Sequence, residues 1–283
     1  MARNKIESKR LMSDYNTRFG GISRLYGSEQ GLWLQQAHIC VVGIGGVGTW
    51  AAEALARTGI GKLTLIDLDD ICTTNTNRQI HALSSSIGRA KVDVMAERIK
   101  FINPDCDITC VEDFVTSDNL FEIFGTKADP KFDVVIDAID SIAAKTALIA
   151  HCKRNKISIV VTGGAGGQLD PSQIQYGDLA KTTHDPLLSR VRNQLRRDFN
   201  FSKNPKRKFS IDCVYSTEQL RYPQLDGTVC AAKTMTEGST RLDCNMGFGA
   251  ATMVTGTFGF FAASKAIDKL LSKKARQNMD SAK

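Results

Sequence analysis

A glycine-rich string, GIGGVG, lies between a short apolar run and a segment with helical spacing, and it constrains the fold more than any other feature. The apolar run at 38–43, HICVVG, is typical of a buried parallel strand. Residues 46–61 carry apolar side chains at helical intervals, and KLTLIDLD at 62–69 predicts a second strand. The three segments therefore predict a β-α-β unit with the glycine loop at the start of its helix.

The alternation of strands and helices continues downstream. Helices are predicted at 91–104 and 143–155, and further strands at 107–114, 132–140 and 157–167. Strands alternating with helices indicate an α/β fold with a doubly wound, mostly parallel Rossmann-like sheet. After Gly167 the rhythm changes, except for a basic helix-like stretch near 186–199. We expect an antiparallel extension in this C-terminal half.

The chain has 283 residues, enough for one large domain or two small ones, and the order of its elements favours a single domain over residues 1–283. Within it we expect a nucleotide-binding core, a substrate-facing extension and a closing helix, at about 36–165, 168–245 and 246–272.

Composition and charge narrow the class of protein. At 42% hydrophobic and 24% charged residues, the chain does not resemble disordered, collagen-like or coiled-coil proteins. The net charge is +7, and the basic residues concentrate in residues 1–10, 189–208 and 265–283. Such runs suggest a polyanionic partner, although their commoner role is solubility.

Cysteine spacing and the N-terminal residues indicate the compartment. No pair among the eight cysteines has the C-x-x-C spacing of structural zinc sites, so we expect no zinc. MARNKIESKR has no apolar run behind its basic residues, so we expect no secretory signal and a cytoplasmic protein with free thiols. Residues 244–264 are uncharged, but their many Gly, Thr, Ser and Asn favour a buried helix over a bilayer span. Membrane association through this segment stays open.

The residues around the glycine loop point to a nucleotide. Backbone amides and the helix dipole at such a loop receive phosphate, and Asp67, at the end of the next strand, can accept hydrogen bonds from ribose hydroxyls. A purely structural turn is the alternative. Asn75, Arg78, Lys91 and Asp140 follow strand ends and would supply the cations and the Mg²⁺ ligand that a triphosphate needs. Singly, the last three could be a surface charge, a helix-start residue and a helix N-cap.

These residues together resemble the adenylating core of the ThiF/MoeB/ubiquitin-activating-enzyme superfamily. The resemblance rests on Gly43, Gly45, Gly46 and Gly48, on Asp67, Asn75, Arg78 and Lys91, and on D-x-x-D at Asp137 and Asp140. It implies that the chain is one ThiF-type adenylating domain with ATP bound at the loop. Asp67 would hold the ribose, Asn75, Arg78 and Lys91 the phosphates, and Asp140 the magnesium. Superfamily dimers also send an arginine into the neighbouring site, which would here be Arg18 or, less favoured, Arg24.

Longer strings resemble the branch of this superfamily that modifies tRNA. They include RFGGISRLYG (18–27), TNTNRQIHAL (74–83), TGGAGGQLDPSQI (162–174), DLAKT (178–182), DGTVCA (226–231) and GFGAATMVTGTFGF (247–260). This resemblance implies ATP-dependent dehydration of N6-threonylcarbamoyladenosine in the tRNA anticodon loop to its cyclic form, by activation of the threonyl carboxylate. Arg18, Arg78, Lys91 and Asp140 would then be the catalytic residues. The paired C-x-x-C motifs of ThiF and MoeB are missing, which puts a ubiquitin-like protein substrate in doubt.

The basic segment offers a place for tRNA phosphates. Its charged residues are Arg190, Arg192, Arg196, Arg197, Lys203, Lys206, Arg207 and Lys208. Phe199, Phe201 and Phe209 lie among them and could either stack on bases or point into the core, and the sequence leaves both open.

Other functional assignments are weaker. The resemblance associates Cys230 with a reactive thiol and the protein with a cysteine desulfurase and its SufE-like partner, although an inert thiol is the ordinary state. The glycines of 162–167 could gather carbonyls around a monovalent cation. Alternative functions are activation of a ubiquitin-like sulfur carrier, a sulfur-trafficking role without RNA chemistry, and NAD-dependent oxidoreduction.

Overall fold

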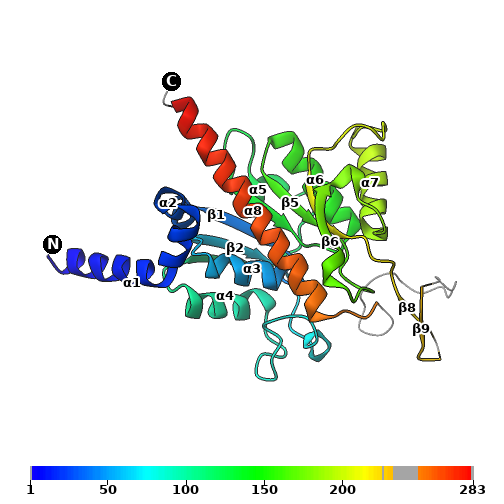
Figure 1. Cartoon of the computed structure of the whole chain (residues 1–283), viewed down its shortest axis with the longest axis horizontal. Coiled ribbons are helices and arrows are strands. Elements are labelled where there is room, and N and C mark those ends of the chain that lie inside the picture. Colours follow the sequence, from blue (N-terminus) through cyan, green and yellow to red (C-terminus); the bar gives the residue numbers. More distant parts are fainter. Residues whose placement is uncertain (1, 225, 232–247, 282–283) are drawn as a thin grey trace.

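The computed structural model describes residues 2–224, 226–231 and 248–281, with side chains from residue 14 onward. Its main feature is a seven-stranded sheet with the strand order β3-β2-β1-β4-β5-β7-β6 (Figure 1). The strands are β1 (His38–Val42), β2 (Lys62–Ile66), β3 (Asp107–Val111), β4 (Val134–Asp137), β5 (Ile159–Thr162), β6 (Ile174–Asp178) and β7 (Asp212–Ser216). Neighbouring strands are parallel except that β6 pairs antiparallel with β7. The predicted doubly wound sheet with an antiparallel extension is therefore confirmed.

Helices cover both faces of the sheet because buried strand residues alternate between the two sides. Ile39 and Val41 face one hydrophobic cluster, and Cys40 and Val42 face the other. The first cluster is closed by α3 (Gly48–Arg57), α4 (Lys91–Ile102) and α8 (Thr252–Ser281), and the second by α5 (Leu120–Phe124), α6 (Ile142–Asn155) and α7 (Pro186–Asp198). The strand order reverses between β1 and β4, which is where sheets of this kind bind ligands, at the carboxyl ends of the strands.

Two N-terminal helices precede the sheet, α1 (Ala2–Tyr26) and α2 (Ser28–Gln36), and the sequence analysis assigned no structure there. Tyr15 and Phe19 anchor α1: both are buried, and the Tyr15 hydroxyl donates to the Gly59 carbonyl at 2.5 Å. This contact places α1 beside the loop that leads into β2, at the amino ends of the parallel strands.

The closing helix α8 differs from its predicted bounds. It begins at Thr252 rather than 246, and residues 246 and 247 lie outside the described part. Residues 248–251 are not helical because the Gly249 carbonyl accepts the Gly167 amide at 2.7 Å, which ties this segment to the loop after β5. Farther along, Gly259 lets α8 approach α3, since a Cβ there would lie 2.6 Å from the Val47 carbonyl. Among the described residues no helix is long and apolar enough to cross a bilayer.

Short elements complete the chain. The 3₁₀ turns are η1 (Thr73–Asn75), η2 (Pro171–Gln173) and η3 (Leu179–Lys181), and β8 (Tyr222–Pro223) pairs with β9 (Val229–Cys230) in a separate hairpin. The predicted strands are shorter than expected, most clearly at two places: the one at 132–140 ends at Asp137, and the one at 157–167 begins at Ile159 and ends at Thr162. In both cases the residues that follow belong to ligand-side loops.

Candidate nucleotide site

The glycine loop connects β1 to α3 and is packed too tightly for larger residues at two positions. Gly43 has a φ of +87°, and a Cβ there would lie 2.8 Å from the Ala138 carbonyl, just beyond β4. A Cβ on Gly48 would lie 1.8 Å from the Gly43 carbonyl. The loop therefore folds back on itself and on the end of β4, which fixes the position of the first turn of α3.

The first turn of α3 is the candidate place for an anion, although Gly48 and Thr49 are buried and the Thr49 amide donates to the Gly45 carbonyl. Its N-cap residue is Val47, and no side chain caps the helix amides. Uncapped amides at a helix start carry partial positive charge and bind phosphate. The geometry of the loop is therefore compatible with its predicted role.

Asp67 follows β2 and holds the loop in place. Its Oδ2 accepts the Ile44 amide at 2.6 Å, and its Oδ1 accepts the Asp69 amide at 2.9 Å. Burial raises the pKa of Asp67, while the nearby Lys91 ammonium and the two amides oppose that rise. A carboxylate held at the loop in this way can also accept hydrogen bonds from a ribose.

Lys91 is the first residue of α4 and points back toward this carboxylate. Its side chain is only 7% exposed, and its Nζ lies 2.7 Å from Asp69 Oδ2 and 3.9 Å from Asp67 Oδ1. The sequence analysis did not identify Asp69, although it lies in the same acidic string after β2. A buried ammonium between two acids is available to a nucleotide phosphate that displaces Asp69.

Arg78 and Asn75 come from the segment between β2 and α4. A Cβ on Gly46 would lie 3.3 Å from the Arg78 Cγ and Cδ, so the arginine stem crosses the glycine loop. Its Nη1 donates to the Thr74 carbonyl and to Asn77 Oδ1. Asn75 is buried, and its Oδ1 accepts the Cys72 amide, so the structure gives it a local turn-forming role.

Asp140 lies on the loop after β4 and is exposed. The prediction that it ends the strand is wrong because the strand ends at Asp137, whose carboxylate turns inward to Lys145 at 2.8 Å. The alternative role as a helix N-cap is also wrong, since Ser141 occupies that position. Asp140 is therefore a solvent-facing carboxylate in the loop after β4, the strand that pairs with β1, and Ala138 of the same loop lies against Gly43.

Two buried residues support the site and were not assigned to it from the sequence. His81 Nε2 lies 3.2 Å from the Ile44 carbonyl, and burial lowers the pKa of His81 to about 4, so the ring is neutral at pH 7. Gln79 is buried with its Oε1 unpaired among the described residues. Both residues lie in the string TNTNRQIHAL at 74–83, so the sequence signal for them was present.

Comparison with known proteins identifies the family. The ThiF family profile matches residues 21–282. The chain belongs to the ThiF family. Two curated ThiF relatives are tRNA threonylcarbamoyladenosine dehydratases: the Escherichia coli protein is 60% identical over 94% of this chain and 98% of its own length, and the Haemophilus influenzae protein is 56% identical over 93% and 97%. The crystal structure of E. coli TcdA in complex with ATP has a TM-score of 0.81, with 56% identity over 93% of this chain and 97% of that one.

The arginines that could complete a ThiF-family dimer lie away from the glycine loop of their own chain. Arg18 is exposed on α1 and pairs with Asp14 at 3.3 Å, and Arg24 is exposed on the same helix. Because α1 is anchored at the amino ends of the strands, neither arginine shares an edge of the sheet with the loop.

The predicted tRNA-binding segment also lies away from the loop. Arg196 Nε donates to the Ser202 carbonyl and Arg197 pairs with Asp198, while Arg192 donates to the Thr182 hydroxyl. Arg190, Lys203, Lys206, Arg207 and Lys208 are exposed. The second half of the segment, from Arg196 onward, precedes β7 at the amino-end edge of the sheet.

The phenylalanines of this segment pack inward. Phe209 is 3% exposed, and Phe199 and Phe201 pack against the second hydrophobic cluster. The Arg154 and Arg196 guanidinium groups lie over the Phe199 and Phe209 rings, each at 5.4 Å. These contacts favour the interpretation of the three phenylalanines as core residues over the interpretation that they stack on bases.

Cys230 and the glycine-rich loop after β5 both have hydrogen-bond partners within the protein. Cys230 is half-buried on β9 and accepts from Gln224 Nε2 at 3.1 Å. In the loop after β5, the Gly164 and Gly167 carbonyls accept hydrogen bonds from Gln168 and Arg221, and the Gly164 amide donates to Asp185. A monovalent cation would share these carbonyls with protein donors.

Proposed function

We propose that the chain is an ATP-dependent enzyme that dehydrates N6-threonylcarbamoyladenosine in the tRNA anticodon loop to its cyclic form. One observation carries the proposal: the chain is 60% identical to a tRNA threonylcarbamoyladenosine dehydratase over 94% of its length. The contacts of Asp67 and Arg78 with the glycine loop, and of Lys91 with Asp67, support a nucleotide site there. Activation of a ubiquitin-like sulfur carrier is the alternative, and the absence of C-x-x-C pairs disfavours it.

ATP would lie along the carboxyl ends of β1, β2 and β4. The uncapped amides of α3 would receive a phosphate, and Asp67 would accept from the ribose. Arg78 already crosses the glycine loop, so its guanidinium can reach phosphate oxygens there. Lys91 would exchange Asp69 for a phosphate, and Asn75 would shape the turn that presents Arg78.

The donor set suits a magnesium ion that arrives with the nucleotide. No cluster of three or more His, Cys, Asp or Glu side chains occurs among the described residues, so this part of the chain provides no complete metal cage. Asp140 is an exposed carboxylate in the loop after β4, and Mg²⁺ is commonly held by one or two carboxylates plus phosphates. Bound there, the metal would neutralise phosphate charge.

The chemistry needs no protein nucleophile. A carboxylate is a poor electrophile, and transfer of a phosphorus-containing group from ATP to one of its oxygens creates a leaving group. The ureido group of the same side chain then attacks the acyl carbon, the activated oxygen departs with that leaving group, and the net change is loss of one water. Intramolecular attack gains from proximity, so the chain mainly has to orient the groups and balance charge.

We further propose that the enzyme acts as a homodimer in which Arg18 enters the partner's nucleotide site. The exposure of Arg18 supports this arrangement, as does its place on α1, which contacts Gly59 ahead of β2 rather than the glycine loop. Arg24 is the second candidate. Sulfur transfer through Cys230 with a cysteine desulfurase and a SufE-like protein stays a prediction.

Nucleoside mass spectrometry tests the reaction. Modified tRNA incubated with the protein and ATP should yield an adenosine lighter by one water, and tRNA without the modification should not change. Arg78→Ala and Asp140→Ala should abolish turnover with the fold intact. Arg89→Ala and Asp129→Ala are matched controls, because both residues are exposed and pair with Glu97 and Lys131. Unchanged tRNA would contradict the function, and full activity of Arg78→Ala would remove Arg78 from the site.

A further inference from the structure

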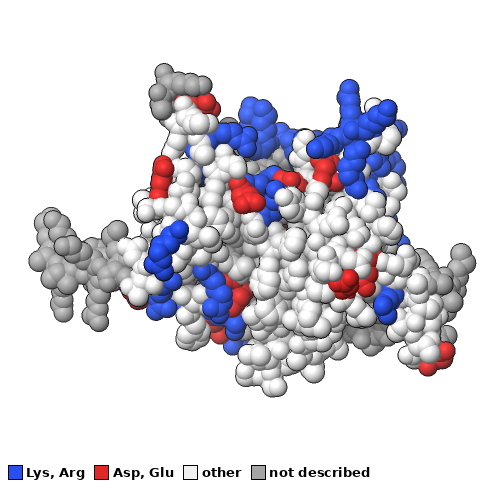
Figure 2. All heavy atoms as spheres, in the orientation of Figure 1, with Lys and Arg blue, Asp and Glu red and all other residues white. Residues whose placement is uncertain are grey.

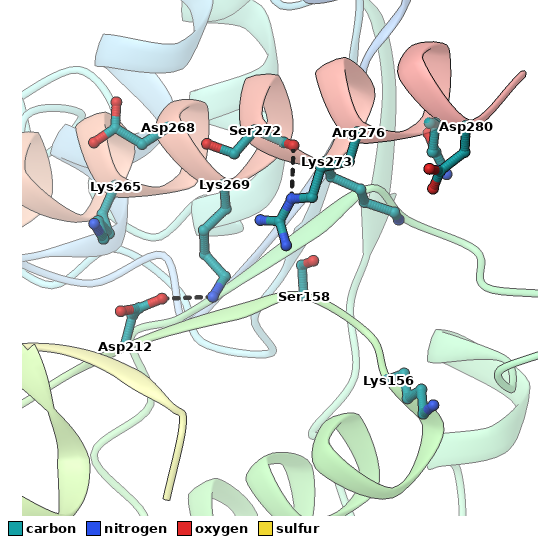
Figure 3. Close-up of a pocket in the computed structure, with 11 residues that line it drawn as sticks. Lys156, Ser158, Asp212, Lys265, Asp268, Lys269, Ser272, Lys273, Arg276 and Asp280 are labelled. Carbon is teal, nitrogen blue, oxygen red and sulfur yellow. Dashed lines mark hydrogen bonds and ion pairs between the residues drawn. The ribbon is translucent and has the colours of Figure 1, made fainter. Parts of the chain in front are cut away.

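The second half of α8 borders a hollow of about 510 Å³ that the proposed reaction does not use. The opposite wall comes from the start of β5 and β7, and Figure 3 shows Lys269 of α8 reaching across to Asp212. Every lining residue is polar or charged: Lys156, Ser158, Asp212, Lys265, Asp268, Lys269, Ser272, Lys273, Arg276, Gln277 and Asp280.

Cations outnumber acids in the hollow, and two of them pair with no described residue. Lys269 Nζ pairs with Asp212 at 2.5 Å, and Lys265 Nζ lies 4.4 Å from the centre of the Tyr176 ring. Arg276 donates to the Ser272 carbonyl of its own helix at 3.1 Å, which leaves its other guanidinium donors for a ligand. Lys156 and Lys273 make no hydrogen bond or ion pair with any described residue.

Lys156 occupies a backbone position that usually selects another residue. It caps α6 with a φ of +55°, in the left-handed region where glycine or asparagine is common. Its amide is used by the cap, bonding to the Cys152 and Lys153 carbonyls, so the side chain is left to line the hollow. A lysine at this position places a cation at the wall formed by the end of α6.

The hollow lies at the edge of the sheet opposite the glycine loop. It is built at the amino ends of β5 and β7, whereas the glycine loop follows the carboxyl end of β1. Helix α8 connects the two regions, because Thr252 Oγ1 donates to the Asn77 carbonyl while Lys273 lines the hollow. At about 1.5 Å per residue, these two ends of α8 are about 30 Å apart.

A second basic group shares this edge. Lys203, Lys206, Arg207 and Lys208 lie in the loop before β7, and Asp178 fixes that loop by accepting the Phe209 and Ser210 amides. Figure 2 shows lysine and arginine side chains gathered along the upper edge of the view, over α7 with the loop after it and over α8. The hollow is thus a recess in a broader basic edge.

We propose that this hollow binds backbone phosphates of the tRNA substrate at a distance from the reacting adenosine. The inference rests on the proposed function and adds a second contact region to it. A span of about 30 Å between the hollow and the nucleotide loop suits a folded RNA that reaches both, with the anticodon loop at one edge and stem phosphates at the other.

The lining favours RNA over a membrane surface. Binding at a bilayer interface needs an apolar face that enters the headgroup region, and the hollow has no apolar lining residue. Flexible lysines around a polar recess match single phosphates instead. Asp212, Asp268 and Asp280 would repel phosphate locally, so the two unpaired lysines and Arg276 set the preferred position.

Charge reversal of the unpaired lysines tests the proposal. Lys156→Glu/Lys273→Glu should weaken binding of whole tRNA by about tenfold and lower the slope of log affinity against log salt by about 2, one unit per lost phosphate contact. Lys62→Glu/Lys127→Glu is the control, since it makes the same charge change at exposed residues that do not line the hollow. We expect the control to have much smaller effects, and ATP affinity without RNA to stay at the wild-type value in both.

The outcomes separate the two proposals. A raised KM for tRNA with an unchanged kcat in the Lys156→Glu/Lys273→Glu variant supports the proposal that the hollow binds tRNA. Unchanged affinity and salt slope, in an enzyme that still converts tRNA, would overturn the hollow alone, whereas no conversion by the wild type would overturn the function. Loss of binding to anionic vesicles with tRNA affinity intact would assign the hollow to lipid and overturn the RNA proposal. Lys156→Gln/Lys273→Gln repeats the test if the Glu variant does not fold.

Discussion

Gly48 lies against the Gly43 carbonyl because the glycine loop folds back on itself. A Cβ at this position would lie 1.8 Å from that oxygen, which no side-chain adjustment relieves because the obstacle is backbone. We therefore expect Gly48→Ala to lose both nucleotide binding and stability, measured by isothermal titration with ATP and by thermal unfolding.

Gly45 provides the contrast within the same loop. An added Cβ would meet only Gln79 Nε2, at 3.9 Å, which is ordinary contact. Gly45→Ala should keep the wild-type unfolding temperature, and any fall in ATP affinity would then report contact with the nucleotide. A Gly48→Ala variant as stable as Gly45→Ala would contradict the tight turn.

His81 predicts a pH dependence. Its pKa in the folded state is about 4, below the usual value of 6.5, because burial disfavours the charged ring. Above pH 6.5 both states are neutral and no stability is lost; as the pH falls from 6.5 toward 4, the unfolded state takes up the proton first. Over that pH range, proton uptake at His81 should lower the free energy of unfolding by up to about 3 kcal/mol.

Urea unfolding of wild type and His81→Gln at pH 7.5 and 4.5 measures this effect. The variant cannot titrate, so the difference in stability between the two pH values should be smaller by that amount. Equal pH dependence in both proteins would show that the ring is not held neutral beneath the glycine loop.

The sequence predicted which residues gather around the glycine loop better than it predicted the residues that hold them in place. Asp67, Arg78 and Lys91 follow strand ends at recognisable spacings, so their convergence could be expected. The pairing of Lys91 with Asp69 depends on how α4 is oriented, which no local pattern encodes. Whether Asp137 or Asp140 faces solvent depends on Lys145 of the following helix.

At the level of elements, a buried ion pair joins β4 to α6. Asp137 and Lys145 are both fully buried and 2.8 Å apart, and Asp137 Oδ1 also accepts the Ile139 amide on the way to Asp140. Lys145→Met should destabilise the protein by about 3–5 kcal/mol, because it leaves an unpaired carboxylate in the core. Chemical denaturation measures the loss.

The double variant Asp137→Asn/Lys145→Met controls for packing. It removes both charges and keeps an acceptor for Ile139, so most of the stability should return. If the double variant were as unstable as the single one, the cost would come from altered packing around Lys145 rather than from the unpaired buried carboxylate.

The parallel core was predictable because its strands are short apolar runs that each end in a ligand-side loop. Helix α1 was missed since basic and polar residues obscure its apolar spacing; among its described side chains, Tyr15 and Phe19 are buried and Ile22 and Tyr26 pack against the first hydrophobic cluster. The start of α8 was placed too early because the bond between Gly167 and Gly249 is a long-range contact.

For the whole molecule, the cysteines should differ widely in reactivity. Cys40, Cys152 and Cys213 are buried, and desolvation raises the pKa of each thiol, whereas Cys72 is exposed. Alkylation at pH 8 followed by peptide mass spectrometry should label Cys72 within minutes and the buried three only after unfolding. Rapid labelling of Cys213 in the native protein would show that the sheet opens near β7.

Helix α8 gives the molecule a property that neither edge has alone. Its first turn is bonded to the segment that carries Arg78, and its later turns form a wall of the basic recess. If ATP and tRNA bind as proposed, both bind next to the same helix, α8. Thermodynamic linkage then requires any effect of one ligand on the binding of the other to be mutual. If bound ATP raises the affinity for RNA by some factor, bound RNA must raise the affinity for ATP by the same factor.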